Sequence, residues 1–257
     1  MMKVELLSHT PDALNLLLST KGTRLQYDAN PTEMTDEERG AHLAYMLGTI
    51  KSSWEFCDYT FRISGVTRAF THQLVRTRTG SYAQEAQRVV NVKDAEVIMP
   101  EFSGFAPGVI AEEIWKETIE GTMRNYGQLV DLGVAVQDAR GLLPTNITTS
   151  IVAKFNLRTL HETAKLRLCT RTQGEYQTVF RAMRDRVLEV HPWADPFIQV
   201  HCVSTGTCAF PHYGPSKCKF YDSRMDNTAL KVELKDRFWA DEELQEANPV
   251  ATKGMAT

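Results

Sequence analysis

The chain has 257 residues, a formal net charge of −3 and a hydrophobic content of 42%. These values predict one large domain, or one domain with a modest appendage, and the near-neutral balance argues against a general nucleic-acid binder. The sequence contains neither an apolar run of about eighteen residues nor a signal peptide, so we expect a cytoplasmic protein without a membrane span.

The first half of the chain mixes strand and helix patterns. Residues 3–10 alternate apolar and polar side chains, as a strand does, and residues 56–66 are rich in aromatic and β-branched side chains. Thr35 with Glu38 predicts a capping box that opens a helix to about residue 50. A second helix is expected to end near Arg76 and to run into a loop.

The second half continues in the same way. A short strand at 95–100 is followed by a helix at 110–132 with one apolar face and by a β-branched run at 142–155. Two further helices are expected at 156–168 and 173–191. The absence of a regular strand–helix alternation predicts an α+β fold with a mixed sheet flanked by helices.

Residues 74–88 carry three arginines, Arg76, Arg78 and Arg88, and a single acid, Glu85. An arginine donates paired hydrogen bonds to phosphate oxygens and stays charged at any working pH, so this stretch suits an anionic ligand. The alternative is a solvated loop whose arginines pair with surface acids. No glycine-rich phosphate-binding motif occurs, so a phosphate would depend on side chains.

A second basic group follows the run at 142–155. Arg167 lies between two leucines, which predicts a partly buried guanidinium that needs a partner. Arg140 is an isolated candidate, with an ion pair to Asp138 as the alternative. The basic side chains of this second group are Arg158, Lys165, Arg167 and Arg171.

The five cysteines do not suggest a disulfide framework, because their number is odd and the chain is large. The C-terminal region combines cysteine and histidine, but it lacks the closely spaced pairs of common zinc sites. We therefore favour reduced cysteines that pack a loop and predict no metal. The residues concerned are His201, Cys202, Cys208, His212 and Cys218.

Four segments, in order, resemble the flavin-dependent thymidylate synthases. That family has Arg-His-Arg, seven residues, Ser, and an Arg two positions on. Here the match is Arg76-Thr77-Arg78, then TGSYAQE, then Ala86-Gln87-Arg88. The upstream YTFRISGV and TRAFTHQLVR, the segment ARGLLP and the stretch NLRTLHETAKLRL resemble the family's equivalents.

The resemblance implies a homotetramer of α+β subunits, with a catalytic domain at residues 1–200 and an irregular extension at 201–257. It implies FAD as the cofactor, NADPH and methylenetetrahydrofolate as co-substrates, and conversion of dUMP to dTMP. It implies FAD contacts by Ser52, Arg76, Thr77, Arg78, Gln84, Asn156 and Arg158. It implies a dUMP site of Gln73, Arg76, Gln84, Ala86, Arg88, Arg140 and Arg167, with Arg167 as the catalytic residue that favours ionisation of the uracil.

Some signature positions differ from the family pattern. Thr77 stands for histidine and Ala86 for serine, while Ile50 and Phe56 replace two histidines of an upstream motif. An alternative is therefore that the same scaffold methylates another pyrimidine nucleotide, such as UMP or dCMP, or adds a hydroxymethyl group. A non-catalytic protein that binds nucleotides or nucleic acid is the alternative from a different class.

Overall fold

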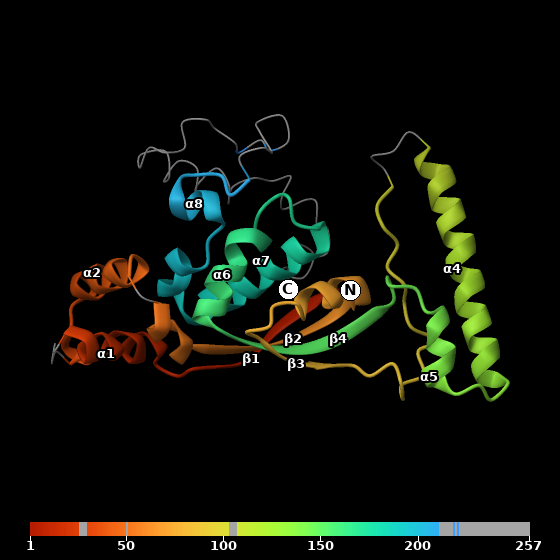
Figure 1. Ribbon diagram of the computed structural model, residues 1–257, viewed down its shortest axis with the longest axis horizontal. Coiled ribbons are helices and arrows are strands. Elements are labelled where there is room, and N and C mark those ends of the chain that lie inside the picture. The colour runs from red at the N-terminus through yellow and green to blue at the C-terminus, as the bar shows by residue number, and fades with distance from the viewer. Residues whose placement is uncertain (26–29, 50, 103–106, 211–217, 219, 221–257) are drawn as a thin grey trace, which may run out of the picture. The chain divides into compact units, whose positions relative to one another are not determined.

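The computed structural model describes residues 1–25, 30–49, 51–102, 107–210, 218 and 220. These residues combine one four-stranded sheet with helices (Figure 1), as the sequence predicts. Ile50, His212 and most of the extension at 201–257 lie outside the described residues. Among the helices of the described part, none is long and apolar enough to cross a membrane.

The sheet has the order β1-β2-β4-β3. Backbone hydrogen bonds join the end of β1 to the start of β2, with Thr10 N–H donating to Asp58 at 3.0 Å. The start of β2 likewise meets the end of β4, and the end of β3 meets the start of β4. The sheet is therefore antiparallel, and the predicted mixed sheet is wrong. The strands span Lys3–His9 (β1), Asp58–Thr67 (β2), Ser81–Gln84 (β3) and Thr148–Asn156 (β4).

The chain divides into two compact units, and β2 and β4 contribute residues to both. The first unit consists of Met1–Lys3, Ile63–Arg76 and Tyr82–Val152. The second unit consists of Val4–Arg62, Thr77–Ser81 and, from Ala153 onward, the remainder of the chain.

The first unit is built around the aromatic side chain of Tyr126, which is completely buried. It packs with Val92, Ala139 and Ile147, and its hydroxyl accepts the N–H of Val92 at 3.4 Å. By contrast, Ile114 on the predicted apolar face is 61% exposed. The helices of this unit are α3 (Arg68–Leu74), α4 (Gly108–Asp131), α5 (Val136–Ala139) and the 3-10 turn η3 (Arg140–Leu142).

The second unit has an aromatic core. Trp54 packs edge-on against Phe197, with ring centroids 4.8 Å apart, and the buried Tyr59 hydroxyl lies 3.0 Å from His191 Nδ1. In Figure 1, α6 and α7 lie side by side over one side of the strands. The helices are α1 (Ala13–Leu25), η1 (Pro31–Glu33), α2 (Asp36–Leu47), η2 (Lys51–Phe56), α6 (Leu157–Arg167), α7 (Gly174–Val190), η4 (Pro192–Phe197) and α8 (His201–Thr205).

Local signals in the sequence account for several of these elements. The predicted capping box at α2 is confirmed, because the Thr35 side chain accepts the N–H of Glu38 while the Glu38 carboxylate accepts the N–H of Thr35 at 2.8 Å. The strand expected at residues 56–66 is confirmed as β2, Asp58–Thr67. Gly65 has a φ of +64°, and a Cβ there would lie 2.3 Å from the carbonyl oxygen of Met1, so only glycine fits.

Other predictions are wrong, and α1 was not foreseen. The loop expected after Arg76 contains β3, and the strand expected at 95–100 is reduced to an isolated bridge between Val97 and Ile147. Each of these outcomes depends on pairing with a distant segment, which local sequence patterns do not reveal.

Candidate functional site

The single acid of the arginine-rich stretch is bound to the sheet. The Glu85 carboxylate accepts the backbone N–H of Ser150 at 3.2 Å and lies 3.4 Å from the Thr149 hydroxyl. Its backbone carbonyl accepts a hydrogen bond from the Arg68 guanidinium at 3.0 Å. Glu85 is therefore held by β4 and α3.

The three arginines of residues 74–88 are exposed. Within the described residues, the side chains of Arg76, Arg78 and Arg88 form neither an ion pair nor a hydrogen bond. The pairing with surface acids that a solvated loop would show is thus absent from this part of the chain. Their full positive charge is available to a ligand.

Turns and strand pairing fix the backbone of this stretch. The Thr77 carbonyl accepts the N–H of Gly80 at 3.0 Å, and the Ala86 carbonyl accepts the N–H of Val90 at 3.2 Å. Between these turns lies β3, where the Gln84 side-chain amide donates to the Thr71 hydroxyl at 2.6 Å. The arginines therefore project from a folded segment with a defined backbone.

The first unit holds a further pair of arginines. Arg140 is exposed and donates to the Gln137 carbonyl at 3.1 Å; the ion pair with Asp138 that was its alternative does not form. Burial lowers the pKa of Arg68, and the positive charge of the nearby Arg140 lowers it further. Sequence reasoning missed Arg68, whose position at a helix start carries no signal for a ligand. An anion bound between Arg68 and Arg140 would relieve their repulsion.

In the second unit, the start of α6 carries two predicted cofactor residues. Asn156 caps the helix, its side chain accepting the N–H of Thr159 at 2.8 Å. The Arg158 guanidinium forms an ion pair with Glu55 of η2. Ser52, in the same turn of 3-10 helix, is exposed, and Phe56, which replaces a histidine of the family motif, is 59% exposed.

Arg167 stands at the end of α6 and has an aromatic partner. Its Cζ lies 4.4 Å from the centroid of the Tyr176 ring, a cation–π arrangement. Tyr176 is completely buried at the start of α7; burial raises the pKa of its hydroxyl, and polar contacts with Thr77 and Arg167 oppose that shift. The predicted partly buried guanidinium is confirmed, and its partner is a ring where an acid would be expected.

The two units divide the predicted residues by role. All residues predicted for the substrate except Arg167 belong to the first unit, and all those predicted for the cofactor except Arg76 and Gln84 belong to the second. The first unit thus holds Gln73, Arg76, Gln84, Ala86, Arg88 and Arg140. The second holds Ser52, Thr77, Arg78, Asn156, Arg158 and Arg167.

Four of the five cysteines line one small cavity of about 30 Å³, namely Cys169, Cys202, Cys208 and Cys218. Burial raises the pKa of Cys202 to about 12 and also raises that of Cys169. Both thiols are therefore protonated at neutral pH. Within the described part of the chain, no group of three or more His, Cys, Asp or Glu side chains is placed to hold a metal ion.

Comparison with known proteins agrees with the sequence motifs. Residues 5–193 match the family model described as "Thymidylate synthase complementing protein". A flavin-dependent thymidylate synthase of Sulfurisphaera tokodaii is 33% identical over 209 residues, covering 79% of each chain. The chain belongs to the flavin-dependent thymidylate synthase family.

Other members of this family are equally similar. The flavin-dependent thymidylate synthase of Pyrococcus furiosus is 34% identical over 193 residues, covering 69% of this chain and 75% of its own. That of Nitratidesulfovibrio vulgaris is 32% identical over 225 residues, covering 80% and 90%. Membership of the flavin-dependent thymidylate synthases therefore extends over most of the chain, even though Thr77 and Ala86 depart from the signature.

Proposed function

We propose that this protein makes dTMP by reductive methylation of dUMP, with methylenetetrahydrofolate as carbon donor and NADPH as reductant of a bound FAD. The observation that carries the proposal is the set of three exposed arginines at residues 74–88 whose single neighbouring acid, Glu85, is held by β4. Two anionic groups, the FAD diphosphate and the dUMP phosphate, would meet this charge. Family membership supplies the reaction.

The residues of the second unit suit a flavin. Arg78, which has no partner among the described residues, offers its guanidinium to a diphosphate. Arg158 can exchange the Glu55 carboxylate for a ligand oxygen because both side chains are about half exposed. Asn156, which ends β4 and caps α6, and Ser52 of η2 add further polar groups. When bound, the reduced flavin supplies the hydride of the reaction.

The chain's own residues would bind and polarise the nucleotide. Arg76 and Arg88 would neutralise the phosphate, with Arg140 and the neighbouring Arg68 as further donors. Gln73, Gln84 and the Ala86 backbone complete the expected contacts. Arg167, oriented by the Tyr176 ring, would stabilise the negative charge that develops on the uracil, since a fixed charge in a water-poor site needs no reorganisation.

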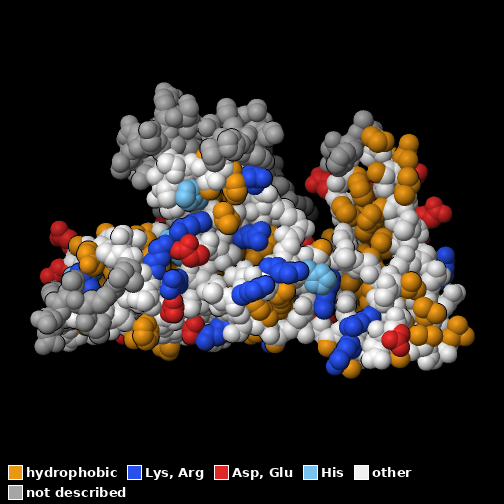
Figure 2. Space-filling view, viewed as in Figure 1, with side chains coloured by type: hydrophobic (Ala, Val, Ile, Leu, Met, Phe, Trp, Pro, Cys, Tyr) orange, Lys and Arg blue, Asp and Glu red, His pale blue; other side chains and the backbone are white. Residues whose placement is uncertain are grey.

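We further propose a homotetramer in the cytoplasm, with a catalytic domain at residues 1–200 and an extension at 201–257. Figure 2 shows hydrophobic side chains gathered on α4. Among them Val109, Ile110 and Ile114 are all more than half exposed, and contact with another subunit would bury them. Because the candidate arginines are also exposed on the single chain, neighbouring subunits would close the site.

The substitutions at Thr77 and Ala86 favour a second candidate, in which another pyrimidine nucleotide is methylated or hydroxymethylated. A threonine hydroxyl and an alanine methyl offer fewer donors than the family's histidine and serine. Turnover of dUMP, UMP and dCMP, measured side by side with product mass, distinguishes the two. Preference for dUMP with a methyl product supports the first proposal.

The proposal is tested with purified protein. It should take up FAD and turn yellow, its visible spectrum should change on addition of dUMP, and it should release tritium from dUMP labelled at C5 when folate and NADPH are present. A colourless protein that binds no FAD would refute it. Light scattering after gel filtration measures the number of subunits independently.

A further inference from the structure

The second unit contains a cavity of about 440 Å³ that the proposed reaction leaves unassigned. Side chains from η2, α6 and α8 contribute to its lining, and the volume is in the range that holds a small ligand. The polar residues at its surface are Lys51, His161, Lys165, Gln199, Ser204 and Thr205.

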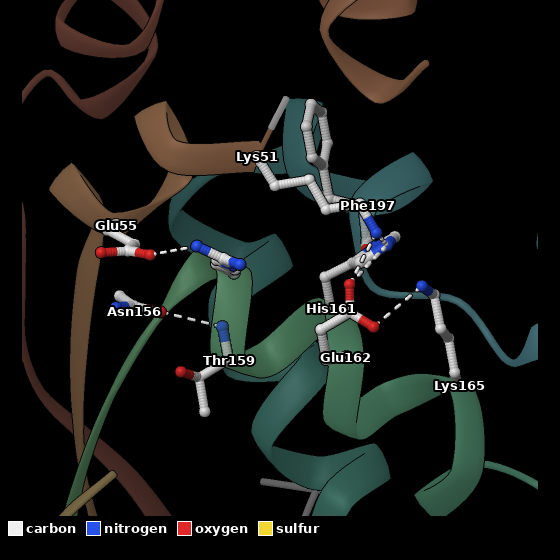
Figure 3. A network of polar contacts seen from close by, with 9 residues as sticks. Lys51, Glu55, Asn156, Thr159, His161, Glu162, Lys165 and Phe197 are labelled. Atoms are coloured by element: carbon white, nitrogen blue, oxygen red, sulfur yellow. Dashed lines mark hydrogen bonds and ion pairs between the residues drawn. The ribbon is translucent and has the colours of Figure 1, made fainter. Parts of the chain in front are cut away.

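Two lysines of this cavity share one carboxylate, as Figure 3 shows. Lys51 Nζ lies 2.6 Å from Glu162 Oε1, and Lys165 Nζ lies 3.0 Å from Glu162 Oε2. Burial alone would raise the pKa of Glu162, but the hydrogen bonds from both lysines outweigh it and lower the pKa to about 2. Burial and the nearby Lys51 lower the pKa of Lys165, and Glu162 opposes this shift. With both lysines protonated, two ammonium groups face one carboxylate, and one positive charge is left over.

His161 adds no charge to this group at neutral pH. Its Nδ1 lies 2.7 Å from the Phe197 carbonyl oxygen, which can only accept, so Nδ1 carries the proton and Nε2 has a lone pair. Nε2 accepts a hydrogen bond from Lys51 Nζ at 3.0 Å. Burial lowers the pKa of His161 to about 4, and the two lysines contribute to the lowering. His161 thus orients the Lys51 ammonium and leaves its charge intact.

The cavity lies on the same elements as the expected flavin contacts. Lys51 directly precedes Ser52 in η2, and His161 and Lys165 lie on α6, the helix that begins after Asn156 and carries Arg158. A hydride donor to the flavin has to bind beside these elements. Of the molecules in the proposed reaction, NADPH is the donor, and its adenosine end carries a phosphate monoester.

We propose that this cavity binds the 2′-phosphate of NADPH through Lys51 and Lys165, an inference that rests on the proposed function. A single carboxylate from an incoming ligand would gain nothing over Glu162, which already bridges both lysines. A phosphate dianion brings a second negative charge and matches both ammonium groups. Glu162 is 49% exposed and can turn toward solvent to make room.

Binding of two probes to the full-length protein, measured by calorimetry at low ionic strength, tests the proposal. Adenosine 2′,5′-bisphosphate carries the 2′-phosphate, and 5′-AMP lacks it. We expect the bisphosphate to bind more tightly, and Lys51→Met and Lys165→Met each to weaken its binding by about 3- to 10-fold while leaving binding of 5′-AMP unchanged. Lys51→Arg, which keeps the charge, should retain most of the affinity.

Two further variants separate ligand binding from a structural role. Glu162→Gln removes the carboxylate that competes for the lysines, so it should tighten binding of the bisphosphate, whereas loss of a merely structural ion pair would not. Lys154→Met is the matched control, because Lys154 pairs at 2.8 Å with Asp58 on the strands of the same unit, and Lys154 is not among the residues that line the cavity. It should leave both affinities unchanged.

Several results would overturn the inference. It fails if the bisphosphate binds no more tightly than 5′-AMP, or if the two lysine variants match Lys154→Met. It also fails if the two lysine variants weaken only the binding of tetrahydrofolate triglutamate, because that result would assign the cavity to the folate carboxylates. Enzyme reduced with dithionite needs no NADPH to release tritium. If this enzyme releases no tritium, the proposed function is wrong. If it does release tritium while the bisphosphate binds no more tightly than 5′-AMP, the assignment of the cavity alone is wrong.

Discussion

The arginines of residues 74–88 and the two lysines at the cavity differ in whether a carboxylate already pairs with them. Arg76, Arg78 and Arg88 have no partner within the described residues, and the one acid among them is bound to β4. Lys51 and Lys165 instead hold their own carboxylate, Glu162. An anion meets the arginines without displacing anything, but at the lysines it has to displace a carboxylate. We therefore expect the arginines to bind an anion more tightly than the lysines do, and their substitution to weaken anion binding more.

The largest effect should come from Arg167, the charge proposed to act on the reacting ring. Arg167→Ala should lower kcat by about 100- to 1,000-fold, as loss of a donor to a developing negative charge does. Single-turnover oxidation of the reduced flavin with dUMP and folate measures the step directly. Arg171→Ala, in the turn that follows α6, is the control and should retain most of the activity. Equal losses in both variants would contradict the role of Arg167.

His161, which lies beside the two lysines, predicts that the stability of the fold depends on pH. The pKa of His161 is about 4 in the folded protein and near the ordinary histidine value of 6.5 in the unfolded chain, so the unfolded chain binds more protons between these values. Stability from the neutral ring is present above pH 6.5 and lost as the pH falls to 4, by up to about 3 kcal/mol. Chemical denaturation across this range measures the slope.

His161→Asn should reduce that slope without abolishing it, because burial also lowers the pKa of His42, His191 and His201. Any loss of stability at neutral pH comes in addition. His72→Asn replaces an exposed histidine on α3 and should leave the slope of stability against pH unchanged. A slope as steep in His161→Asn as in the unsubstituted protein would show that His161 is not the main titrating group. The arginine-rich stretch contains no histidine, since Thr77 stands where the family has one.

A binding effect of intermediate size is expected in the arginine-rich stretch. Arg88→Gln removes one charged donor to the dUMP phosphate and should weaken dUMP binding by about 10- to 100-fold. The effect should be smaller at high salt, because salt screens the lost charge. Titration of the flavin spectrum with dUMP measures it. Arg186→Gln, a surface arginine that pairs with Glu189 at 2.8 Å, is the matched control. If Arg88→Gln weakened dUMP less than Lys51→Met weakens the bisphosphate, the contrast between free and paired cations would be wrong.

What the sequence could predict here follows the range of the interaction. The capping box of α2 joins residues three apart, and the charge of residues 74–88 is visible in one stretch. The engagement of Glu85 with Ser150 spans 65 positions, and that of Lys51 with Glu162 spans 111. No local pattern reports such pairs, so the sequence identified the cations but could not say which of them are already neutralised.

The partner of Arg167 illustrates the same limit and yields the smallest effect. Two flanking leucines predict partial burial and hence a partner, yet the partner is the ring of Tyr176, nine residues along the chain. A ring supports the guanidinium without neutralising it, which leaves the full charge for the substrate. The replacement of histidine by Thr77 fits this arrangement, because the small side chain makes its polar contact with the Tyr176 hydroxyl.

Tyr176→Leu should remove the stacking and lower kcat by about 2- to 30-fold, corresponding to about 0.5–2 kcal/mol, with little change in the Kd of dUMP. Tyr176→Phe keeps the ring and should restore most of the rate, which a merely structural role of the hydroxyl would not allow. Thr77→Val tests the hydroxyl contact alone and should have the weakest effect. If Leu and Phe at position 176 reduced kcat equally, the ring would not position Arg167, and the charge would have to be held by another subunit.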